Sequence, residues 1–314
     1  MKRGIFNITF AISFLVIFSI IIRLYFDDFA QALTEEPKYF PPHKALPIDK
    51  CQEWTNIVRD FGIEVEESVD NVTVLLYHRV IPEEELRDNH YDHNGELYST
   101  ILVKEDFEEQ MALLKDHDYV TLTAKELQLF LKGELGIPKN SVVITFDDGF
   151  KDNYYEAYPV LKEHDFHAIN FIITSFINVR DVDHDPTYSQ YLSVSDVEKG
   201  CDVFEYQSHT YNFHERTFNF KAFLEVKPND EIKEDLLSSI NNLNDNKRAF
   251  AYPYGEYNDR TITILEEIGF EMAFTTAYTN AKVGDNLYEI PRKEVYANTS
   301  IEEFKVIMGL DEEQ

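Results

Sequence analysis

The chain has 314 residues, of which 44% are hydrophobic and 14% aromatic, so it can bury one substantial core and is too apolar for an intrinsically disordered protein. Its 58 acidic residues against 29 Lys and Arg give a formal charge of −29, which argues against a nucleic-acid partner, because phosphate binding needs clustered cations. The acidity either attracts a neutral or cationic partner or merely keeps an exported chain soluble.

The N-terminus has the pattern of an export signal or a membrane helix. Lys2 and Arg3 precede an apolar run over residues 4–22, which is long enough to span a bilayer. Because the cationic flank comes first, the rest of the chain is expected on the far side of the membrane. We therefore expect residues 1–27 to be a signal or transmembrane anchor, and the protein to be extracytoplasmic, either membrane-anchored or secreted to the cell surface. Cleavage near Ala30-Gln31-Ala32 stays open.

Residues 28–70 are polar and contain four prolines, which is typical of a loosely packed extracytoplasmic tether. Cys51 and Cys201 are the only two cysteines and are far apart in the chain, so the sequence has no paired-cysteine metal motif. An oxidising compartment would permit a disulfide between them, but the sequence cannot show the close Cα approach that a bridge requires. Both the free and the paired state stay open.

Beyond residue 70, short apolar runs alternate with segments of helical periodicity. Strands are expected over 72–77, 141–146, 168–173, 203–206, 250–252 and 272–275, and helices over 104–115, 124–131, 153–164, 194–199, 230–243 and 259–268, the last closed by Gly269. This alternation predicts an α/β domain over residues 71–314, with a parallel sheet and helical crossovers arranged as a (β/α) barrel or an open sheet.

Polar side chains follow four of the expected strands. In α/β folds, working residues gather at the carboxyl ends of strands, where loops position them around a crevice. His78 follows the first strand, Asp147 and Asp148 follow the next, His209 follows another, and the Tyr252-Pro253-Tyr254-Gly255 turn follows a fourth. We therefore expect these groups to meet around one crevice.

Asp148, His209 and His214 together make a usual ligand set for a catalytic Zn²⁺, with a position left open for water. Co²⁺ or Ni²⁺ could occupy the same ligands. Bound metal would lower the pKa of a water molecule to about 7, and the adjacent Asp147 would serve as general base. Asp-Asp-Gly alone is equally a good turn, and a lone histidine is more often structural, so this interpretation depends on the joint pattern.

Three segments resemble the motifs of the NodB-homology polysaccharide deacetylases, carbohydrate esterase family 4. They are Thr145-Phe146-Asp147-Asp148-Gly149, Ser208-His209-Thr210-Tyr211-Asn212-Phe213-His214 and Phe250-Ala251-Tyr252-Pro253-Tyr254-Gly255. The resemblance runs from about residue 72 to residue 308. It implies a distorted (β/α) barrel, an N-acetylglucosamine polysaccharide as substrate, and a divalent metal, Zn²⁺ before Co²⁺ or Ni²⁺, on Asp148, His209 and His214.

Two departures from the family pattern indicate one of its branches. Four residues separate His209 from His214, where the family usually has three, and no histidine follows Phe270 to take the place of the family's late catalytic histidine. Instead, Leu75-Leu76-Tyr77-His78-Arg79-Val80 resembles the circularly permuted branch that deacetylates poly-β-1,6-N-acetylglucosamine in biofilm matrix. The resemblance therefore implies this exopolysaccharide as the substrate.

The resemblance also assigns catalytic roles. Asp147 is expected to be the general base, His78 the general acid, and the backbone N–H of Tyr254 a donor to the oxyanion. Many family members have an arginine as the second residue of the third motif, where it orients the base, but Ala251 stands there in this chain. Arg292 is expected to take over this role, unless it is a surface residue.

Hydrolysis of the acetamido group would release acetate and leave a cationic glucosamine unit. Three other functions stay open: a peptidoglycan or chitin N-deacetylase, a catalytically inactive glycan-binding homologue, and a structural membrane protein with incidental histidines. The position of His78 argues against the first, and the presence of every expected polar group argues against the second, although similarity of fold never proves activity.

Overall fold

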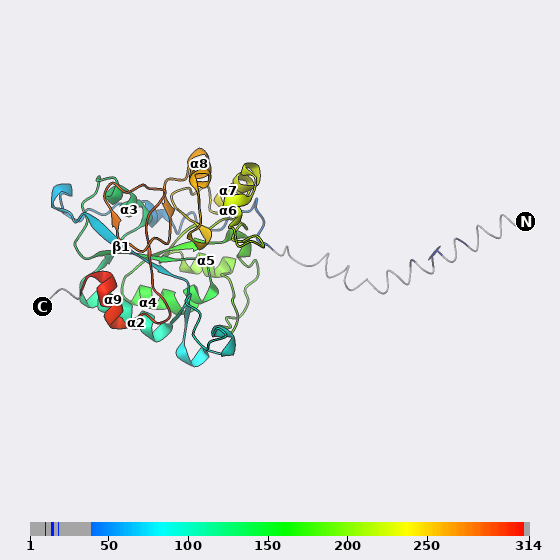
Figure 1. The fold of residues 1–314 in the computed structure, drawn as a ribbon, viewed down its shortest axis with the longest axis horizontal. Coiled ribbons are helices and arrows are strands. Elements are labelled where there is room, and N and C mark those ends of the chain that lie inside the picture. The colour runs from blue at the N-terminus through cyan, green and yellow to red at the C-terminus, as the bar shows by residue number, and fades with distance from the viewer. Residues whose placement is uncertain (1–9, 11–13, 16–17, 19–38, 311–314) are drawn as a thin grey trace, which may run out of the picture. The chain divides into compact units, whose positions relative to one another are not determined.

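A nine-stranded, mostly parallel sheet forms the centre of the protein in the computed structural model (Figure 1). The structure describes residues 39–310 and, before them, residues 10, 14, 15 and 18. The predicted signal or anchor over 1–27 lies outside the described residues, apart from those four. Among the residues that are described, no helix combines the length and the apolarity needed to cross a bilayer.

Six parallel strands lie side by side in the order β1, β5, β6, β7, β8 and β9. They are Asn71–Tyr77, Ser141–Phe146, Ala168–Ile172, Phe204–Ser208, Phe250–Ala251 and Ala273–Phe274. β4 (Val120–Thr121) adds a parallel neighbour to β5, and β10 (Ala281–Lys282) runs antiparallel beside β1. Each of the six predicted strands is present with its ends within two residues of the prediction, so the expected α/β architecture with a parallel sheet is confirmed.

The segment 290–294 brings the two ends of the sheet together. Ile290 forms a parallel bridge with Phe274 of β9, while β11 (Lys293–Glu294) pairs in parallel with β1. Because this short segment contacts both β9 and β1, which lie at opposite sides of the six parallel strands, the sheet curls toward an irregular barrel. The sequence did not predict β11, which is only two residues long and has no apolar run.

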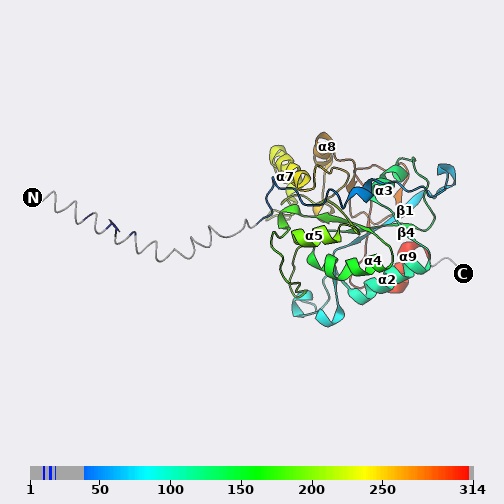
Figure 2. The ribbon, with the colours of Figure 1, turned by 180° about the vertical axis from the view of Figure 1, so that it is seen from behind.

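Helices cover both sides of the sheet. They are α2 (Lys104–Asp116), α3 (Ala124–Leu131), α4 (Tyr158–Glu163), α5 (Val194–Gly200), α6 (Phe223–Val226), α7 (Asn229–Asn242), α8 (Asp259–Ile268) and α9 (Ile301–Met308), and a small second sheet pairs β2 (Arg79–Ile81) with β3 (Ile101–Val103). The views from front and back agree that α2, α4 and α9 lie on one side and that α3, α7 and α8 lie on the other (Figures 1 and 2).

Successive residues of a strand serve different cores. Val74 of β1 belongs to the core beneath α3, whereas the next residue, Leu75, belongs to the core shared with α2. This follows from the period of two along a strand, and it explains why the central strands are apolar without alternation. Local signals set the helix ends: at α3, Thr123 and Glu126 form a reciprocal capping box, and α8 ends at Gly269, whose φ is 93°.

The lead-in segment that precedes β1 packs on the domain. Phe40, Leu46 and Ile48 are buried in the same core as Leu75 and are at most 3% exposed. The Leu46 N–H donates to the backbone oxygen of Asn242, the last residue of α7. The prediction of a loose tether over 28–70 is therefore wrong for its described part. Apolar residues scattered between prolines have no period, so their burial could not be predicted from the pattern.

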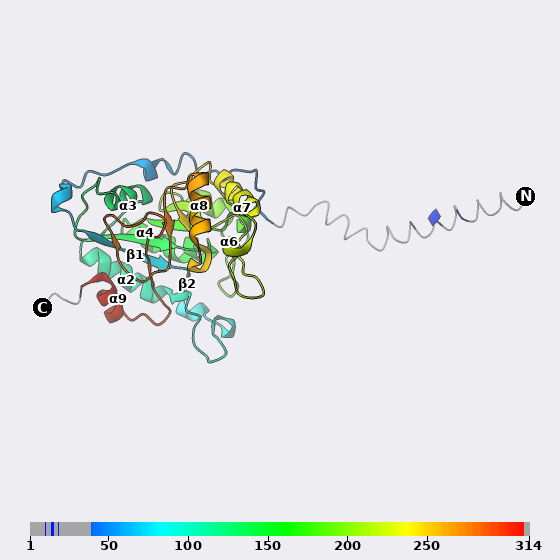
Figure 3. The ribbon, with the colours of Figure 1, turned by 45° about the horizontal axis from the view of Figure 1, so that its top comes forward.

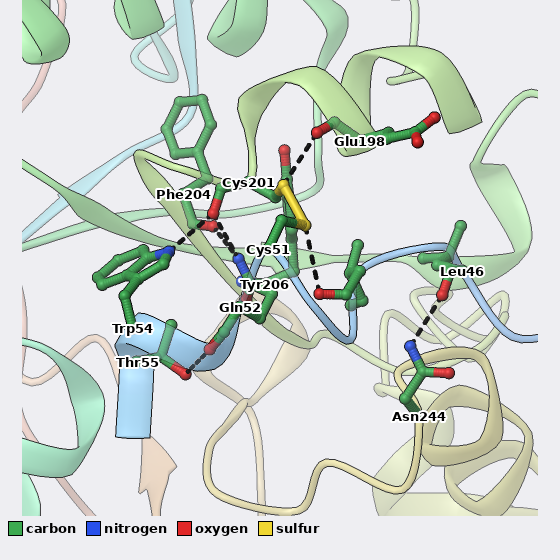
Figure 4. The surroundings of a disulfide bond; sticks show 11 residues. Leu46, Cys51, Gln52, Trp54, Thr55, Glu198, Cys201, Phe204, Tyr206 and Asn244 are labelled. Carbon is green, nitrogen blue, oxygen red and sulfur yellow. Dashed lines mark hydrogen bonds between the residues drawn. A yellow bond between two sulfur atoms is a disulfide. The ribbon is translucent and has the colours of Figure 1, made fainter. Parts of the chain in front are cut away.

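A disulfide joins the lead-in segment to the end of α5. Cys51 and Cys201 are bonded, with their Cα atoms 5.7 Å apart, which settles the question that the sequence left open. The Gln52 amide donates to the backbone oxygens of Cys201 and Phe204, and the Trp54 indole donates to the Cys201 oxygen (Figure 4). These contacts lie at the start of β7, at the opposite end of the strand from His209.

Candidate active site

The predicted metal ligands meet at the carboxyl edge of the sheet. One ligand atom from each of Asp148, His209 and His214 lies within 4.8 Å of the others. Asp148 follows β5, and His209 follows β7 directly. His214 comes from the loop beyond β7, so the three ligands come from two strand ends and one loop.

A sharp turn after β5 separates the two neighbouring aspartates. The Asp147 N–H still donates to the backbone oxygen of Tyr77 and so continues the pairing with β1. Asp148 and Gly149 then both have positive φ, 71° and 74°, which turns the chain out of the strand. A Cβ on Gly149 would lie 2.8 Å from Ile172 Cγ2, so this position requires glycine. The turn lets the two carboxylates face different partners.

Asp147 is held by Arg292 in a two-point contact. Arg292 Nη1 lies 2.7 Å from Asp147 Oδ1, and Arg292 Nη2 lies 2.8 Å from Oδ2, with both side chains buried. Arg292 is itself fixed, since its Nε donates to the Thr275 oxygen. Burial alone would raise the pKa of Asp147, but the attraction of Arg292 and the neighbouring histidines together outweighs burial and holds that pKa below its ordinary value. Asp147 is therefore an oriented, ionised carboxylate, and Arg292 is not a surface residue.

The three ligand atoms form a cluster that suits a cation. Asp148 Oδ1 lies 3.1 Å from His214 Nε2 and 3.5 Å from His209 Nε2, yet this buried oxygen makes no hydrogen bond of acceptable geometry within the described chain. His209 Nδ1 lies 2.8 Å from the Ala251 oxygen, which can only accept, so Nδ1 carries the proton and Nε2 is free as a ligand. An unsatisfied carboxylate oxygen that faces imidazole nitrogens fits a divalent metal.

The pKa of His214 agrees with this interpretation, and the pKa of His209 reflects the negative charge of the carboxylates around it. Burial lowers the pKa of His214 to about 4, against the attraction of Asp148, so His214 is neutral at pH 7, the form that binds a metal. Burial would also lower the pKa of His209, but the attraction of Asp147 and Asp148 outweighs it and raises that pKa. The attraction that favours a proton on His209 would equally favour a divalent cation in its place.

The loop between the two histidines is fastened from outside the sheet. Asp235 of α7 accepts the N–H of Tyr211 with Oδ1 at 3.0 Å and the N–H of Asn212 with Oδ2 at 2.7 Å. On the other side, the Ser175 N–H donates to the Tyr211 oxygen, and the Ser175 hydroxyl donates to Asn212 Oδ1. These contacts hold the backbone of the loop between His209 and His214, so they determine where the imidazole of His214 lies.

His78 lies beside the carboxylates on the neighbouring strand end. It follows β1, its backbone oxygen accepts from the Asn153 amide at 2.7 Å, and its side chain is 17% exposed. β1 pairs with β5 up to Tyr77 and Phe146, so His78 and Asp147 follow directly neighbouring strand ends. His78 Nδ1 lies 3.8 Å from Oε1 of Glu294 on β11.

Tyr254 forms the rim of the site beside His214. Its φ of 60° is in the left-handed region, so the turn of residues 253–255 presents its backbone differently from a helix. The Tyr254 hydroxyl donates to the His214 backbone oxygen at 3.2 Å, and the two ring centroids are 4.5 Å apart. The turn is therefore adjacent to the ligand cluster, as the sequence predicted.

Two residues of the site were not predicted from the sequence. Glu294 stands two positions after Arg292 in an extended segment, so both side chains project to the same side, one toward His78 and the other toward Asp147. Asp235 occupies a position of α7 whose neighbours Ile232 and Leu236 are buried. A charged residue at a helix position whose apolar neighbours predict burial was the signal that could have identified Asp235.

The chain is similar in sequence to known polysaccharide deacetylases. The family model for polysaccharide deacetylase matches residues 136–273. The poly-β-1,6-N-acetyl-D-glucosamine N-deacetylase of Staphylococcus aureus (strain MSSA476) is 30% identical over 229 residues, which cover 71% of this chain and 78% of that protein. The residues that the family model matches contain the turn after β5 and the histidines after β7.

Solved structures show the same fold. The Streptococcus pyogenes deacetylase PplD in complex with acetate superposes with a TM-score of 0.63 at 26% identity, over 76% of this chain and 98% of that one. IcaB from Ammonifex degensii superposes with a TM-score of 0.61 at 24% identity, over 77% of this chain and 97% of that one. With the ligand cluster, the oriented carboxylate and these similarities together, the chain belongs to the polysaccharide deacetylase family and is a polysaccharide N-deacetylase.

Proposed function

We propose that this enzyme removes N-acetyl groups from poly-β-1,6-N-acetyl-D-glucosamine and releases acetate. The observation that carries this proposal is the position of His78 and Asp147 on neighbouring strand ends, with Asp147 Oδ2 3.9 Å from Nε2 of the ligand His209. A histidine at this first strand is the feature by which the sequence resembles the β-1,6-specific branch. The name of the Staphylococcus aureus relative supports the same substrate.

The ligand set of one carboxylate and two imidazoles is that of a catalytic zinc site, so we infer that Zn²⁺ is the metal, with Co²⁺ or Ni²⁺ as substitutes. When bound, such a metal acts as a Lewis acid toward the acetamido carbonyl and makes hydroxide available near neutral pH. Asp148 and the two Nε2 atoms of His209 and His214 would hold it. The Nδ1–H bond of His209 to Ala251 would keep that imidazole oriented.

The remaining residues divide the proton transfers between them. Asp147, kept ionised and oriented by Arg292, takes a proton from the attacking water. The backbone N–H of Tyr254 donates to the oxyanion that develops on the substrate, a contact whose loss typically lowers the rate by about 10²–10³. His78, which lies 3.8 Å from Glu294, then gives a proton to the leaving amine. The acetamide C–N bond breaks, and acetate and a glucosamine unit result.

We further propose that the domain works outside the cytoplasm, either membrane-anchored or released to the cell surface. The cationic and apolar residues over 2–22 support export. The disulfide between Cys51 and Cys201 supports an oxidising compartment, because such bonds are rare in reducing ones. Fractionation of cells that produce the chain tests this proposal, and recovery of the enzyme in the cytosol with reduced cysteines would contradict it.

A panel of substrates tests the proposed function. Full-length enzyme is incubated with β-1,6-linked N-acetylglucosamine oligomers, with chitin oligomers and with peptidoglycan, and released acetate is measured. We expect the highest kcat/KM for the β-1,6-linked oligomers. Activity on peptidoglycan or chitin alone would favour that rival substrate, and binding of the β-1,6 oligomers without acetate release would favour an inactive glycan-binding protein.

A further inference from the structure

Two phenylalanines are exposed on a short hairpin beside the active site. Phe218 is 99% exposed and Phe220 is 78% exposed, among the highest values for large apolar side chains in the described chain. They lie in residues 215–222, which we call the aromatic hairpin. It begins directly after His214 and leads into α6, and the segment before α6 projects from the domain in Figure 3.

The aromatic hairpin has a defined backbone. Arg216 and Ala222 form an antiparallel bridge at its base. At its tip, the Thr217 N–H donates to the Lys221 oxygen at 2.8 Å, and the Phe220 N–H donates to the Thr217 oxygen at 2.9 Å. The two phenylalanines are therefore presented by an ordered turn with its own hydrogen bonds.

The base of the hairpin is fastened to the rim of the active site. The Arg216 guanidinium lies 3.9 Å from the centre of the Tyr254 ring and forms an ion pair with Glu256. The Ala222 N–H donates to Glu256 Oε2 at 3.1 Å. Because Tyr254 also contacts His214, the hairpin and the ligand cluster belong to one connected structure.

Neither the exposure nor the conformation of these residues is explained by folding. Phe220 has a φ of 59°, a left-handed conformation that is unfavourable for a bulky side chain. Its ring recovers little of this by burial, since most of it faces solvent. A residue that is both strained and exposed indicates a function at that position, and so do two large apolar side chains placed together in water.

We propose that Phe218 and Phe220 stack against sugar rings of the polymer strand whose acetamido group occupies the active site. This inference rests on the proposed function. Phe218 lies four positions after His214, so at most about 14 Å of extended chain separates them, and the rings lie within a few sugar units of the ligand cluster. The negative face of an aromatic ring attracts the C–H face of a pyranose and the ammonium of a deacetylated unit.

Charge favours the glycan over a lipid surface as the occupant. The chain has a formal charge of −29, which opposes its approach to an anionic bilayer. A polymer that is neutral before reaction and cationic after it meets no such repulsion. The aromatic hairpin thus adds a contact for the polymer on the side of His214 and Tyr254.

The test compares enzymes with and without the two rings. In a Phe218→Ser, Phe220→Asn double variant, we expect KM for long β-1,6-linked oligomers to rise about tenfold, which corresponds to about 1.4 kcal/mol, with kcat unchanged. KM for the shortest reactive oligomer should not change, because it cannot reach the hairpin. Phe218→Tyr, which keeps a ring, should behave like the wild type, and Leu237→Ser, which removes an exposed side chain of α7, is the matched control.

A stability measurement separates this role from a structural one. Asparagine tolerates a left-handed conformation, so Phe220→Asn should raise Tm or leave it unchanged while it weakens use of long oligomers. An unchanged KM for long oligomers would overturn the proposal. If the same variant also lost binding to phosphatidylglycerol vesicles, the hairpin would be assigned to a membrane instead. Wild-type enzyme that released no acetate from any oligomer would instead overturn the proposed function, and the hairpin's role with it.

Discussion

The active site has two halves that are positioned by different means: the pair of carboxylates after β5, and His214 in its loop. Asp147 and Asp148 follow β5 directly, and pairing with β1 continues up to the Asp147 N–H. His214 lies five positions after His209, in a loop that Asp235 of α7 and Ser175 hold in place. The carboxylate half and His209 therefore take their positions from the sheet, whereas the His214 half depends on side chains from elsewhere in the fold.

Residues that contact these two parts should therefore have different roles, one in the reaction and the other in the assembly of the metal site. Arg292 contacts the carboxylate half and acts on the charge and orientation of a reacting group. Asp235 contacts only the backbone of the loop, so it acts on where a metal ligand lies. Changes at Asp147 or Arg292 should lower kcat with the metal still bound, and changes to the loop that carries His214 should lower metal affinity. Single substitutions can break this separation, and the largest effect is expected at the reacting carboxylate itself.

Asp147→Asn should have the largest effect. An amide cannot accept the proton of the attacking water, so kcat should fall by about 10²–10⁴ while the metal content stays at the wild-type level. Acetate release and elemental analysis of the same preparation measure both quantities. If this variant kept its full kcat, Asp147 would not be the general base.

Arg292→Lys should have the next largest effect. Lysine keeps the positive charge but cannot make the two parallel contacts to Asp147, so the carboxylate loses its orientation. We expect kcat to fall by about 10–100-fold with little change in Zn²⁺ affinity. A loss of metal affinity equal to the loss of kcat would show that the two halves are not separable.

Asp235→Asn should act on the other half. The substitution keeps the size of the side chain but replaces one acceptor with an NH₂ group, which faces a backbone N–H of Tyr211 or Asn212 and displaces the loop. We expect Zn²⁺ affinity, measured by titration of metal-free protein, to fall by about 10–100-fold. Glu234→Gln, a neighbour on α7 with the same change of charge, is the control and should bind Zn²⁺ normally. Unchanged Zn²⁺ affinity in Asp235→Asn would remove the assembly role.

Loss of the disulfide should affect neither half. Cys51→Ser with Cys201→Ser should lower the free energy of unfolding by about 2–4 kcal/mol, because the unfolded chain regains the freedom that the bond removes. The bond lies at the start of β7, away from the carboxyl edge, so kcat and Zn²⁺ affinity should not change. Denaturant unfolding and acetate release test this, and a selective loss of Zn²⁺ affinity in the stable fraction would contradict it.

The sequence predicted the parts of this protein that depend on local pattern. Apolar runs located the six main strands, and the polar residues that follow those runs identified Asp147, Asp148 and His209 as candidates for one site. Arg292 was predicted only by a resemblance, because its partner is 145 positions away.

The parts that the sequence did not predict depend on contacts between distant segments. Glu294 and Asp235 act through single contacts across the fold, and such contacts leave no period in the sequence. The lead-in segment is buried through scattered residues such as Phe40, which gain their partners only when the sheet and α7 are in place. The exposure of the aromatic hairpin also could not be predicted from the sequence, because it depends on how the rest of the domain folds.

Metal removal followed by metal return tests the central claim most directly. Acetate release from β-1,6-linked N-acetylglucosamine oligomers is measured for full-length enzyme before treatment with a chelator, after it, and after addition of Zn²⁺. The ligand cluster of Asp148, His209 and His214 predicts that activity is lost with the chelator and restored by Zn²⁺ in the wild type, but not restored in Asp148→Ala. Undiminished acetate release by protein shown to be free of metal would contradict this account.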